Sequence, residues 1–208
     1  MTITLYHFPQ SRSLRVAWLL EEMGLEYTLK TIPAATAREY AKTPEYQAIN
    51  LLGKYPTLID GDLTMVESVA IMDYLMHKYD AGSLKPDVSS PDYGPFTQWL
   101  HFGESGMGMY VIMLFAHSYL LPEEHRSARI AEWGRAETHK CLEFLASGLG
   151  DKDYLCTSGF TAADISVFYM LYLLKIIRQF DDAPDNLKAY FDRLKQKPVW
   201  QKISAIEA

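Results

Sequence analysis

The chain has 208 residues, of which 49% are hydrophobic and 22% charged, a composition typical of folded globular proteins. Its formal net charge of -6 at pH 7 argues against nucleic acid as a partner, because surfaces that bind nucleic acid carry an excess of Lys and Arg. No apolar run approaches the ~20 residues that span a bilayer, and the N-terminus lacks a signal-peptide pattern, so we expect a cytoplasmic protein that binds a small molecule and no membrane.

The beginning of the chain predicts a strand, a helix and a second strand. Residues 2–8 (TITLYHF) have the pattern of a strand, and residues 13–24 (SLRVAWLLEEMG) show a helical apolar period that ends at Gly24. Residues 26–32 (EYTLKTI) alternate apolar and polar side chains, as a half-buried strand does.

The stretch YPTLIDGDLTMVE, residues 55–67, predicts a β-hairpin. Asp60-Gly61 is a strong turn signal between its two short apolar runs. Pro56 fits the first residue of a strand if its nitrogen faces away from the neighbouring strand. From residue 68 to residue 79 the apolar period becomes helical.

Beyond residue 80 the strand patterns stop. Residues 81–91 are rich in Gly, Ser and Pro and predict a linker. Long helical patterns follow at residues 92–120, 123–147, 161–178 and 185–195. We therefore predict two domains, an α/β domain of order β-α-β-α-β-β-α over residues 1–80 and an all-helical domain over residues 92–208.

The segment GFTAADISVF contains a well-formed helix start. Thr161 can accept a hydrogen bond from the amide of Asp164, whose side chain can return one to the Thr161 amide. Phe160 and Ile165 stand on either side of this capping box. We expect this cap to matter for folding and not for chemistry.

The start of the helix at Ser68 predicts a site for an amino-acid group. The first amides of a helix are unpaired and partly positive, so they bind carboxylates readily. Glu67, just before the helix, can hold an ammonium group. The pair suits the α-amino-acid end of a ligand, and a serine that only caps its helix is the alternative.

The bond between Tyr55 and Pro56 bears on the same ligand. A cis bond here would turn the backbone of Tyr55 outward, where its N–H and C=O can pair with an extended peptide as an added strand. Proline alone does not predict this geometry, because only about 5–6% of X-Pro bonds in folded proteins are cis.

The order of elements, the stretch GKYPTLIDGDLTMVESVAIMDYL and the later FTAADI resemble a cytosolic glutathione transferase. The SRS at the first helix is similar to serine-type bacterial and fungal members, and the resemblance covers essentially the whole chain. It implies a thioredoxin-like domain, a linker and an all-helical domain. No cysteine stands at the turn into the first helix, which disfavours the thiol-disulfide branch of the family.

The resemblance also implies how glutathione is bound. Pro56 would be cis, the backbone of Tyr55 would pair with the cysteinyl unit, and Glu67 with Ser68 would hold the γ-glutamyl end. Tyr55 departs from the family pattern, in which a smaller aliphatic residue is usual, but its contact is through the backbone. Lys54 is a candidate partner of the glycyl carboxylate, with a solvated loop lysine as the alternative.

A transferase must supply glutathione as thiolate. A thiol with a pKa of about 8.5 is only ~3% ionised at pH 7, and lowering the pKa by ~2 units takes about 2.7 kcal/mol and raises that fraction to roughly three quarters. One hydroxyl donor and a helix N-terminus can supply this. Carried over by position, Ser11 is the first candidate donor. Ser13 and Tyr6 are the alternatives, and helix capping is the other interpretation of both serines.

The glycine-rich segment GESGMGMY predicts a close approach or a kink in a helix. The resemblance implies that this helix lines a pocket for an apolar electrophile, with Met107, Tyr110 and Met113 as candidate contacts. Packing into the core is the alternative. Glu104 is a candidate to reach the γ-glutamyl amine across a dimer. It shares a helical face with His101, but the sequence supplies no further ligands, so we expect no metal.

The resemblance thus implies a cytoplasmic, homodimeric detoxification enzyme that joins the glutathione thiolate to hydrophobic electrophiles. A glutathione-dependent isomerase, dehalogenase or peroxidase is a nearby alternative. A protein that keeps the fold and binds glutathione without turnover is the alternative from another class.

Overall fold

The computed structural model describes residues 2–205, which form two compact units. The first unit runs to Leu84 and resumes at Gln196, and the second is Lys85–Lys195. The sequence predicts a boundary near residue 80 and a helical domain that continues to residue 208. The structure instead groups the last helix with the first unit.

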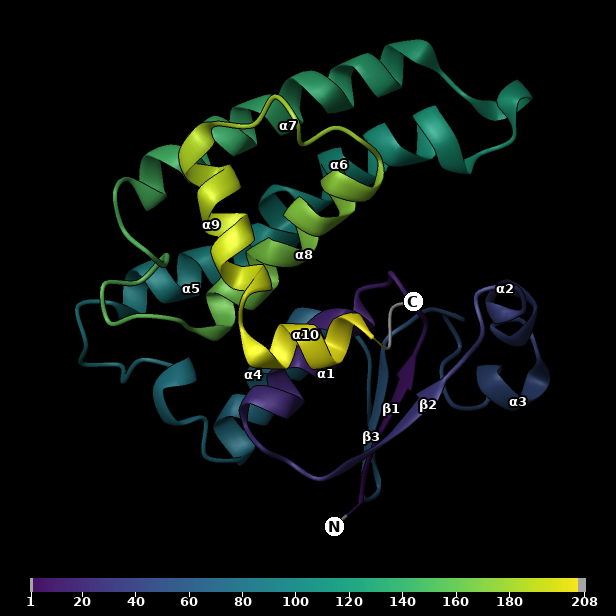
Figure 1. Cartoon of the computed structure of the whole chain (residues 1–208). Helices are drawn as coiled ribbons and strands as arrows, with labels where there is room; N and C mark the ends of the chain where they lie inside the picture. Colours follow the sequence, from purple (N-terminus) through teal and green to yellow (C-terminus); the bar gives the residue numbers. More distant parts are fainter. Residues whose placement is uncertain (1, 206–208) are drawn as a thin grey trace. The chain divides into compact units, whose positions relative to one another are not determined.

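A four-stranded mixed sheet forms the centre of the first unit (Figure 1). Its strands are β1 (Ile3–His7), β2 (Tyr27–Thr31), β3 (Thr57–Asp60) and β4 (Leu63–Met65). The order across the sheet is β2-β1-β3-β4, with β1 parallel to β2 and antiparallel to β3, and β3 antiparallel to β4. The central strand β1 is buried at four of its five residues.

The helices of the first unit are α1 (Ser13–Glu22), α2 (Ala37–Tyr40), α3 (Pro44–Gln47), α4 (Ser68–Lys78), the short 3-10 turn η1 (Gly82–Leu84) and α10 (Pro198–Ser204). Helices α1 and α4 pack against each other. Up to α4 the order is β-α-β-α-α-β-β-α, with two short helices where the sequence predicts one. The predicted thioredoxin-like domain is confirmed.

Neighbouring side chains of β1 point to opposite faces of the sheet, as strand geometry requires. His7 contacts Ser13 at the start of α1, whereas Tyr6 packs with Tyr46 of α3. One face of β1 therefore lies toward α1, and the other lies against an aromatic cluster that includes Tyr6 and Tyr46.

The hairpin turn lies one residue later than predicted. Asp60 pairs with Leu63, so the two turn residues are Gly61 and Asp62 instead of Asp60 and Gly61. Gly61 has a φ of +61°, and a glycine at the first turn position is what a type II′ turn requires.

Asp60 joins this hairpin to the end of α4. Its buried carboxylate accepts hydrogen bonds from Tyr74 at 2.9 Å and from Lys78 and Tyr79 at 2.8 Å. Burial alone would raise the pKa of Asp60, but hydrogen bonds from Lys78, Tyr79 and Tyr74 outweigh it, so the pKa lies below its ordinary value.

Asp60→Asn is therefore expected to lower the free energy of unfolding by about 1–2 kcal/mol at pH 7, because the three donors lose a charged acceptor. A lowered carboxyl pKa stabilises the fold above the unfolded pKa of about 4, and this contribution is lost as the pH falls through the folded value. Urea unfolding at pH 7 and pH 3.5 should show the difference between variant and wild type shrinking in acid. An equal difference at both pH values would contradict this.

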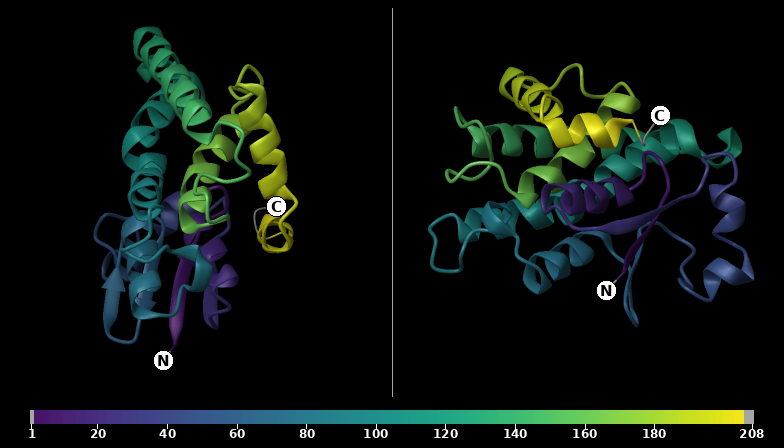
Figure 2. Two further views of the ribbon diagram at one scale, coloured as in Figure 1. Left: turned by 90° about the vertical axis from the view of Figure 1, so that its left-hand side faces the viewer. Right: turned by 60° about the horizontal axis from the view of Figure 1, so that its bottom comes forward.

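The second unit is helical. Its helices are α5 (Tyr93–His101), α6 (Gly108–Phe115), α7 (Ala128–Leu149), α8 (Ala162–Ile176) and α9 (Asp185–Lys195), with π-helical turns η2 (Phe102–Gly106) and η3 (Ala116–Leu120) and the 3-10 turn η4 (Glu123–His125). Helices α6 and α7 lie side by side (Figure 2). Twelve of the fifteen residues of α8 are buried, so α8 is the core of this unit.

The glycine-rich segment lies where α8 approaches. A Cβ on Gly103 would stand 2.6 Å from Ser166 Oγ, so only glycine fits there. The predicted close approach is confirmed, and the chain forms the π-helical turn η2 at this point. At the start of α8 the predicted capping box between Thr161 and Asp164 is present.

The short helix α10 packs on α1 within the first unit (Figure 1). The rings of Trp18 and Trp200 have centroids 5.1 Å apart, and Lys202 pairs with Glu21. These contacts explain why α10 groups with the sheet.

Candidate functional site

Three polar side chains form a row where the chain passes from β1 into α1: His7 at the end of β1, Ser11 in the loop and Ser13 at the start of α1. Ser11 Oγ lies 2.6 Å from Ser13 Oγ, which lies 2.8 Å from His7 Nδ1. His7 and Ser13 are fully buried, whereas Ser11 is only partly buried. Of the two candidate serines, Ser11 is therefore the one that a ligand can reach.

No sequence motif singles out His7. Ile3, Leu5 and His7 share one face of β1 and are all buried. The strand pattern itself indicates this residue, because one polar side chain follows two inward-facing apolar ones. Buried polar groups are generally hydrogen-bonded to a specific partner.

Tyr6, the third candidate donor, points to the other face of β1. Its hydroxyl accepts a hydrogen bond from Lys30 at 3.1 Å, and its ring lies 5.5 Å from that of Tyr46. The structure thus brings Ser11 and Ser13 together and keeps Tyr6 in the aromatic cluster.

The loop before β3 is fixed from several sides. Tyr55-Pro56 is cis, as the resemblance implies. Gly53 has a φ of +57°, and a Cβ there would stand 2.6 Å from the carbonyl oxygen of Ala41, so a larger residue does not fit. The exposed Lys54 has its carbonyl held by Tyr46 and Asn50, each at 2.8 Å.

Tyr55 turns its side chain inward and leaves its backbone available. The ring stacks on Tyr46 with centroids 5.1 Å apart, and the hydroxyl donates to the carbonyl of Ala37 at 3.2 Å. Burial raises the pKa of Tyr55 to about 12, so the phenol stays neutral. Among the hydrogen bonds described for residues 2–205, none uses the backbone N–H or C=O of Tyr55.

The start of α4 combines a strained residue with a buried cation. Glu67 is exposed and has a φ of +69°, which non-glycine residues rarely adopt and which is common at functional sites. Ser68 is buried, and its hydroxyl accepts from Arg15 Nη1 at 3.2 Å. The Arg15 guanidinium is fully buried beside the first residue of α4. Its positive charge is of the same sign as the partial charge at the start of this helix.

Two contacts join these three segments. The rings of Phe8 and Tyr55 lie 5.9 Å apart, and Arg15 of α1 reaches Ser68 of α4. The β1–α1 loop, the loop before β3 and the start of α4 are thus neighbours in the first unit.

The candidate electrophile contacts lie in the second unit. Met107 is fully buried, which favours the core alternative for this residue. Tyr110 is partly buried and packs edge-on against Trp133, with centroids 5.6 Å apart. Met113 and Glu104 are also partly buried, on α6 and η2.

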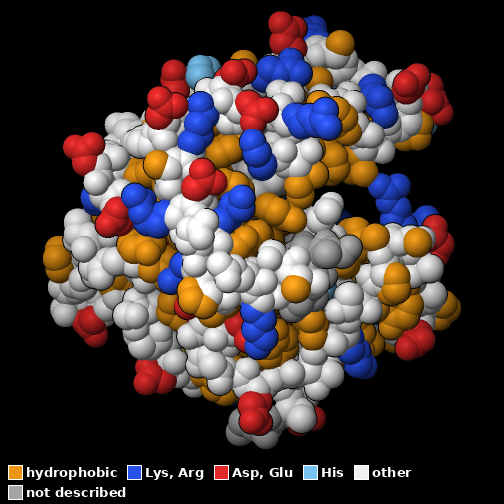
Figure 3. All heavy atoms as spheres, in the orientation of Figure 1, with side chains coloured by type: hydrophobic (Ala, Val, Ile, Leu, Met, Phe, Trp, Pro, Cys, Tyr) orange, Lys and Arg blue, Asp and Glu red, His pale blue; other side chains and the backbone are white. Residues whose placement is uncertain are grey.

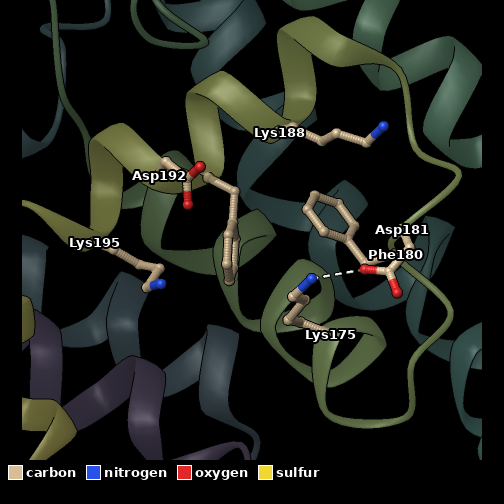
Figure 4. A pocket seen from close by; sticks show the side chains of 7 residues that line it. Lys175, Phe180, Asp181, Lys188, Asp192 and Lys195 are labelled. Carbon is tan, nitrogen blue, oxygen red and sulfur yellow. Dashed lines mark hydrogen bonds and ion pairs between the residues drawn. The ribbon is translucent and has the colours of Figure 1, made fainter.

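A pocket of about 330 Å³ in the second unit contains none of the predicted site residues (Figure 4). Three lysines, two aspartates and two phenylalanines line it, and Lys175 Nζ pairs with Asp181 Oδ1 at 2.6 Å. Acidic and basic side chains also lie close together over the face shown in Figure 3. Charge in this pocket is therefore largely balanced within the chain.

The part of the chain that the structure describes holds neither a cluster of metal-binding side chains nor a membrane-spanning helix. No group of three or more His, Cys, Asp or Glu side chains gathers in residues 2–205 to hold a metal ion. Over the same residues, each helix is too short or too polar to cross a membrane.

Two family models match the chain. The model of the glutathione S-transferase N-terminal domain matches residues 1–77, and that of the C-terminal domain matches residues 82–193. The chain belongs to the glutathione S-transferase family.

Curated relatives include fungal and bacterial proteins. The glutathione S-transferase-like protein gedE of Aspergillus terreus is 33% identical, covering 92% of this chain and 90% of its own. Glutathione S-transferase GstA of Escherichia coli O157:H7 is 26% identical, covering 98% of both chains.

Solved structures share the fold. The glutathione transferase URE2P6 of Phanerochaete chrysosporium, in complex with oxidized glutathione, has a TM-score of 0.85 at 27% identity and covers 99% of this chain and 96% of its own. The glutathione S-transferase of Xylella fastidiosa has a TM-score of 0.85 at 25% identity, covering 99% and 98%.

Proposed function

We propose that this chain is a glutathione transferase that joins the thiolate of glutathione to hydrophobic electrophiles. The observation that carries the proposal is that three segments of one unit are in contact: the segment with the partly exposed Ser11, the loop with the open backbone of Tyr55 and the start of α4 at Ser68. These are the groups that a thiol, an extended peptide backbone and an amino-acid head require.

Each part of glutathione has a proposed partner. The γ-glutamyl carboxylate binds the Ser68 hydroxyl and the first amides of α4, where Arg15 adds positive charge, and the ammonium group binds Glu67. The cysteinyl unit pairs with the backbone of Tyr55 beside Pro56, as an added strand does. Lys54, exposed in the same loop, takes the glycyl carboxylate.

Ser11 is the proposed catalytic residue. Its hydroxyl donates a hydrogen bond to the thiolate sulfur, which stabilises the charged form and lowers the pKa of the thiol. The dipole of α1 acts in the same direction. The thiolate then forms the carbon–sulfur bond, and the electrophile takes up the electron pair or releases it with a leaving group.

The remaining roles are proposed for the second unit and for the assembly. Tyr110 and Met113 contact the apolar electrophile. Glu104 reaches the γ-glutamyl amine of a second copy in a homodimer. We propose a cytoplasmic location and a detoxification role for this dimer.

Glu67→Ala is expected to weaken glutathione binding about 10- to 100-fold, because a hydrogen bond to a charged group contributes roughly 1.5–3 kcal/mol. The rate at saturating glutathione should change little, since Glu67 does not touch the sulfur. Calorimetry and initial rates check this. Asp62→Ala, at the exposed hairpin turn, makes the same change of charge and should leave the affinity unaltered. Equal affinities for both variants would contradict the assignment.

Calorimetry with glutathione, followed by initial rates with an aryl halide, an epoxide, an unsaturated carbonyl compound and a hydroperoxide, tests the proposed function. We expect binding and conjugation with at least one of the first three. Binding without turnover on any compound would favour a glutathione-binding protein without catalysis. The absence of binding would overturn the proposal.

A further inference from the structure

The hydrogen bonds in the row formed by His7, Ser13 and Ser11 can run in two directions. A hydroxyl donates one hydrogen bond and accepts up to two, and a neutral imidazole nitrogen either donates or accepts. The hydrogen bonds of 2.8 Å and 2.6 Å can therefore run from His7 outward or from Ser11 inward.

The outward direction leaves the Ser11 hydrogen available. In it, His7 Nδ1–H donates to Ser13 Oγ, and the Ser13 hydroxyl donates to Ser11 Oγ. The Ser13 amide, 3.3 Å from Ser11 Oγ, adds a second donor. Both acceptor positions of Ser11 Oγ are then occupied from inside the chain, so its own hydrogen points outward.

The inward direction would disable the donor. If His7 Nδ1 accepted from Ser13, the Ser11 hydroxyl would donate to Ser13 Oγ and have no hydrogen for a sulfur. The amide of Phe8 donates to Ser13 Oγ at 3.3 Å in either case. The Phe8 carbonyl, also 3.3 Å from Ser13 Oγ, competes for the Ser13 hydrogen, but the contact with Ser11 Oγ is shorter at 2.6 Å. With the Ser13 hydrogen in the row, the tautomer of His7 separates the two directions.

We propose that His7 is a positioning residue, which acts through Ser13 to hold the Ser11 hydroxyl as a donor toward the thiolate of glutathione. The inference rests on the proposed function, in which Ser11 is the donor. Full burial of His7 and Ser13 keeps water from competing for these groups. In such a buried row of low dielectric, each hydrogen bond polarises the next, which makes the Ser11 hydroxyl at its end a stronger donor.

Ser13→Ala and His7→Leu test the direction. The apparent pKa of glutathione bound to each variant is read from the ultraviolet absorbance of the thiolate as the pH is varied. We expect kcat/KM at pH 7 to fall ~3- to 10-fold in both, through a higher thiol pKa, with glutathione affinity within about 2-fold of wild type. The double variant should fall no further than the single ones, because both interrupt one chain.

His7→Asn is the conservative variant, since its side-chain amide can donate near the position of Nδ1. We expect it to restore the thiol pKa to near the wild-type value, which a purely structural role of His7 would not require. If His7→Leu does not fold, Ser13→Ala carries the test. The inward direction predicts a lower thiol pKa in Ser13→Ala, because removing the Ser13 hydroxyl would release the Ser11 hydrogen. That result, or no change, would overturn the proposal.

The proposed function and this inference fail differently. A wild-type protein that leaves the thiol pKa at the value of free glutathione would overturn both. A lowered pKa in the wild type that Ser11→Ala abolishes, with Ser13→Ala and His7→Leu unchanged, would overturn only the role of His7.

Discussion

Ser11→Ala is expected to lower kcat/KM for conjugation about 10- to 25-fold at pH 7. Without the donor, the ionised fraction of the bound thiol falls from roughly three quarters toward ~3%. The deficit should depend on pH. Near pH 9.5 an unassisted thiol is itself mostly ionised, so the variant should come within about 2-fold of wild type. Steady-state rates at pH 7 and 9.5 check both parts.

Ser89→Ala is the matched control, since it removes an exposed hydroxyl outside the site and should leave both rates unchanged. A deficit in Ser11→Ala that is equal at the two pH values would indicate a role other than ionising the thiol. Unchanged turnover at pH 7 would contradict the assignment of Ser11 as the donor.

Asp164→Ala is expected to have the largest effect on stability, lowering the free energy of unfolding by about 3–5 kcal/mol. The Asp164 carboxylate is fully buried and accepts from the amides of Thr161 at 2.8 Å and Leu155 at 3.0 Å and from the Tyr190 hydroxyl at 2.8 Å. The Thr161 hydroxyl also donates to this carboxylate, at 3.2 Å, so alanine removes the acceptor of four donors. Each buried donor left unpaired costs about 1–3 kcal/mol. Urea unfolding measures the change.

Burial raises the pKa of Asp164 above its ordinary value, so the charge itself is not favoured at this position. Asp164→Asn, which keeps one acceptor oxygen, should therefore destabilise less than alanine. Asp151→Ala removes an exposed carboxylate and should change the free energy of unfolding by less than about 0.5 kcal/mol. A loss of no more than 1 kcal/mol in Asp164→Ala would contradict the importance of the cap.

The spacing of apolar residues predicts most of the helices and strands, because burial of one face imposes a regular apolar period on each element. Helix α9 has the predicted bounds, and both predicted hairpin strands are present. The turn was misplaced by one residue because Asp60-Gly61 matches a frequent turn dipeptide, whereas the three hydrogen bonds to Asp60 keep this residue in the strand. Helix α10 was missed because its seven residues are too few to show a period.

The candidate site could be predicted only where a sequence motif is local. Glu67-Ser68 and Tyr55-Pro56 are each adjacent in sequence, and contacts from Arg15 and Phe8 link their segments to the segment that holds Ser11. The roles of His7 and Arg15 depend on contacts across the fold, since Arg15 meets Ser68 fifty-three residues away. Met107 shows the converse, because an apolar residue on a helix has the same pattern whether it packs into a core or against a ligand.

The pKa of the glutathione thiol on the wild-type protein tests the central claim most directly. A titration followed by ultraviolet difference absorbance, with Ser11→Ala beside it, gives this value. We expect the bound thiol to ionise ~2 units below free glutathione in the wild type, and close to free glutathione in the variant. A bound thiol that ionises like free glutathione in the wild type would contradict the account.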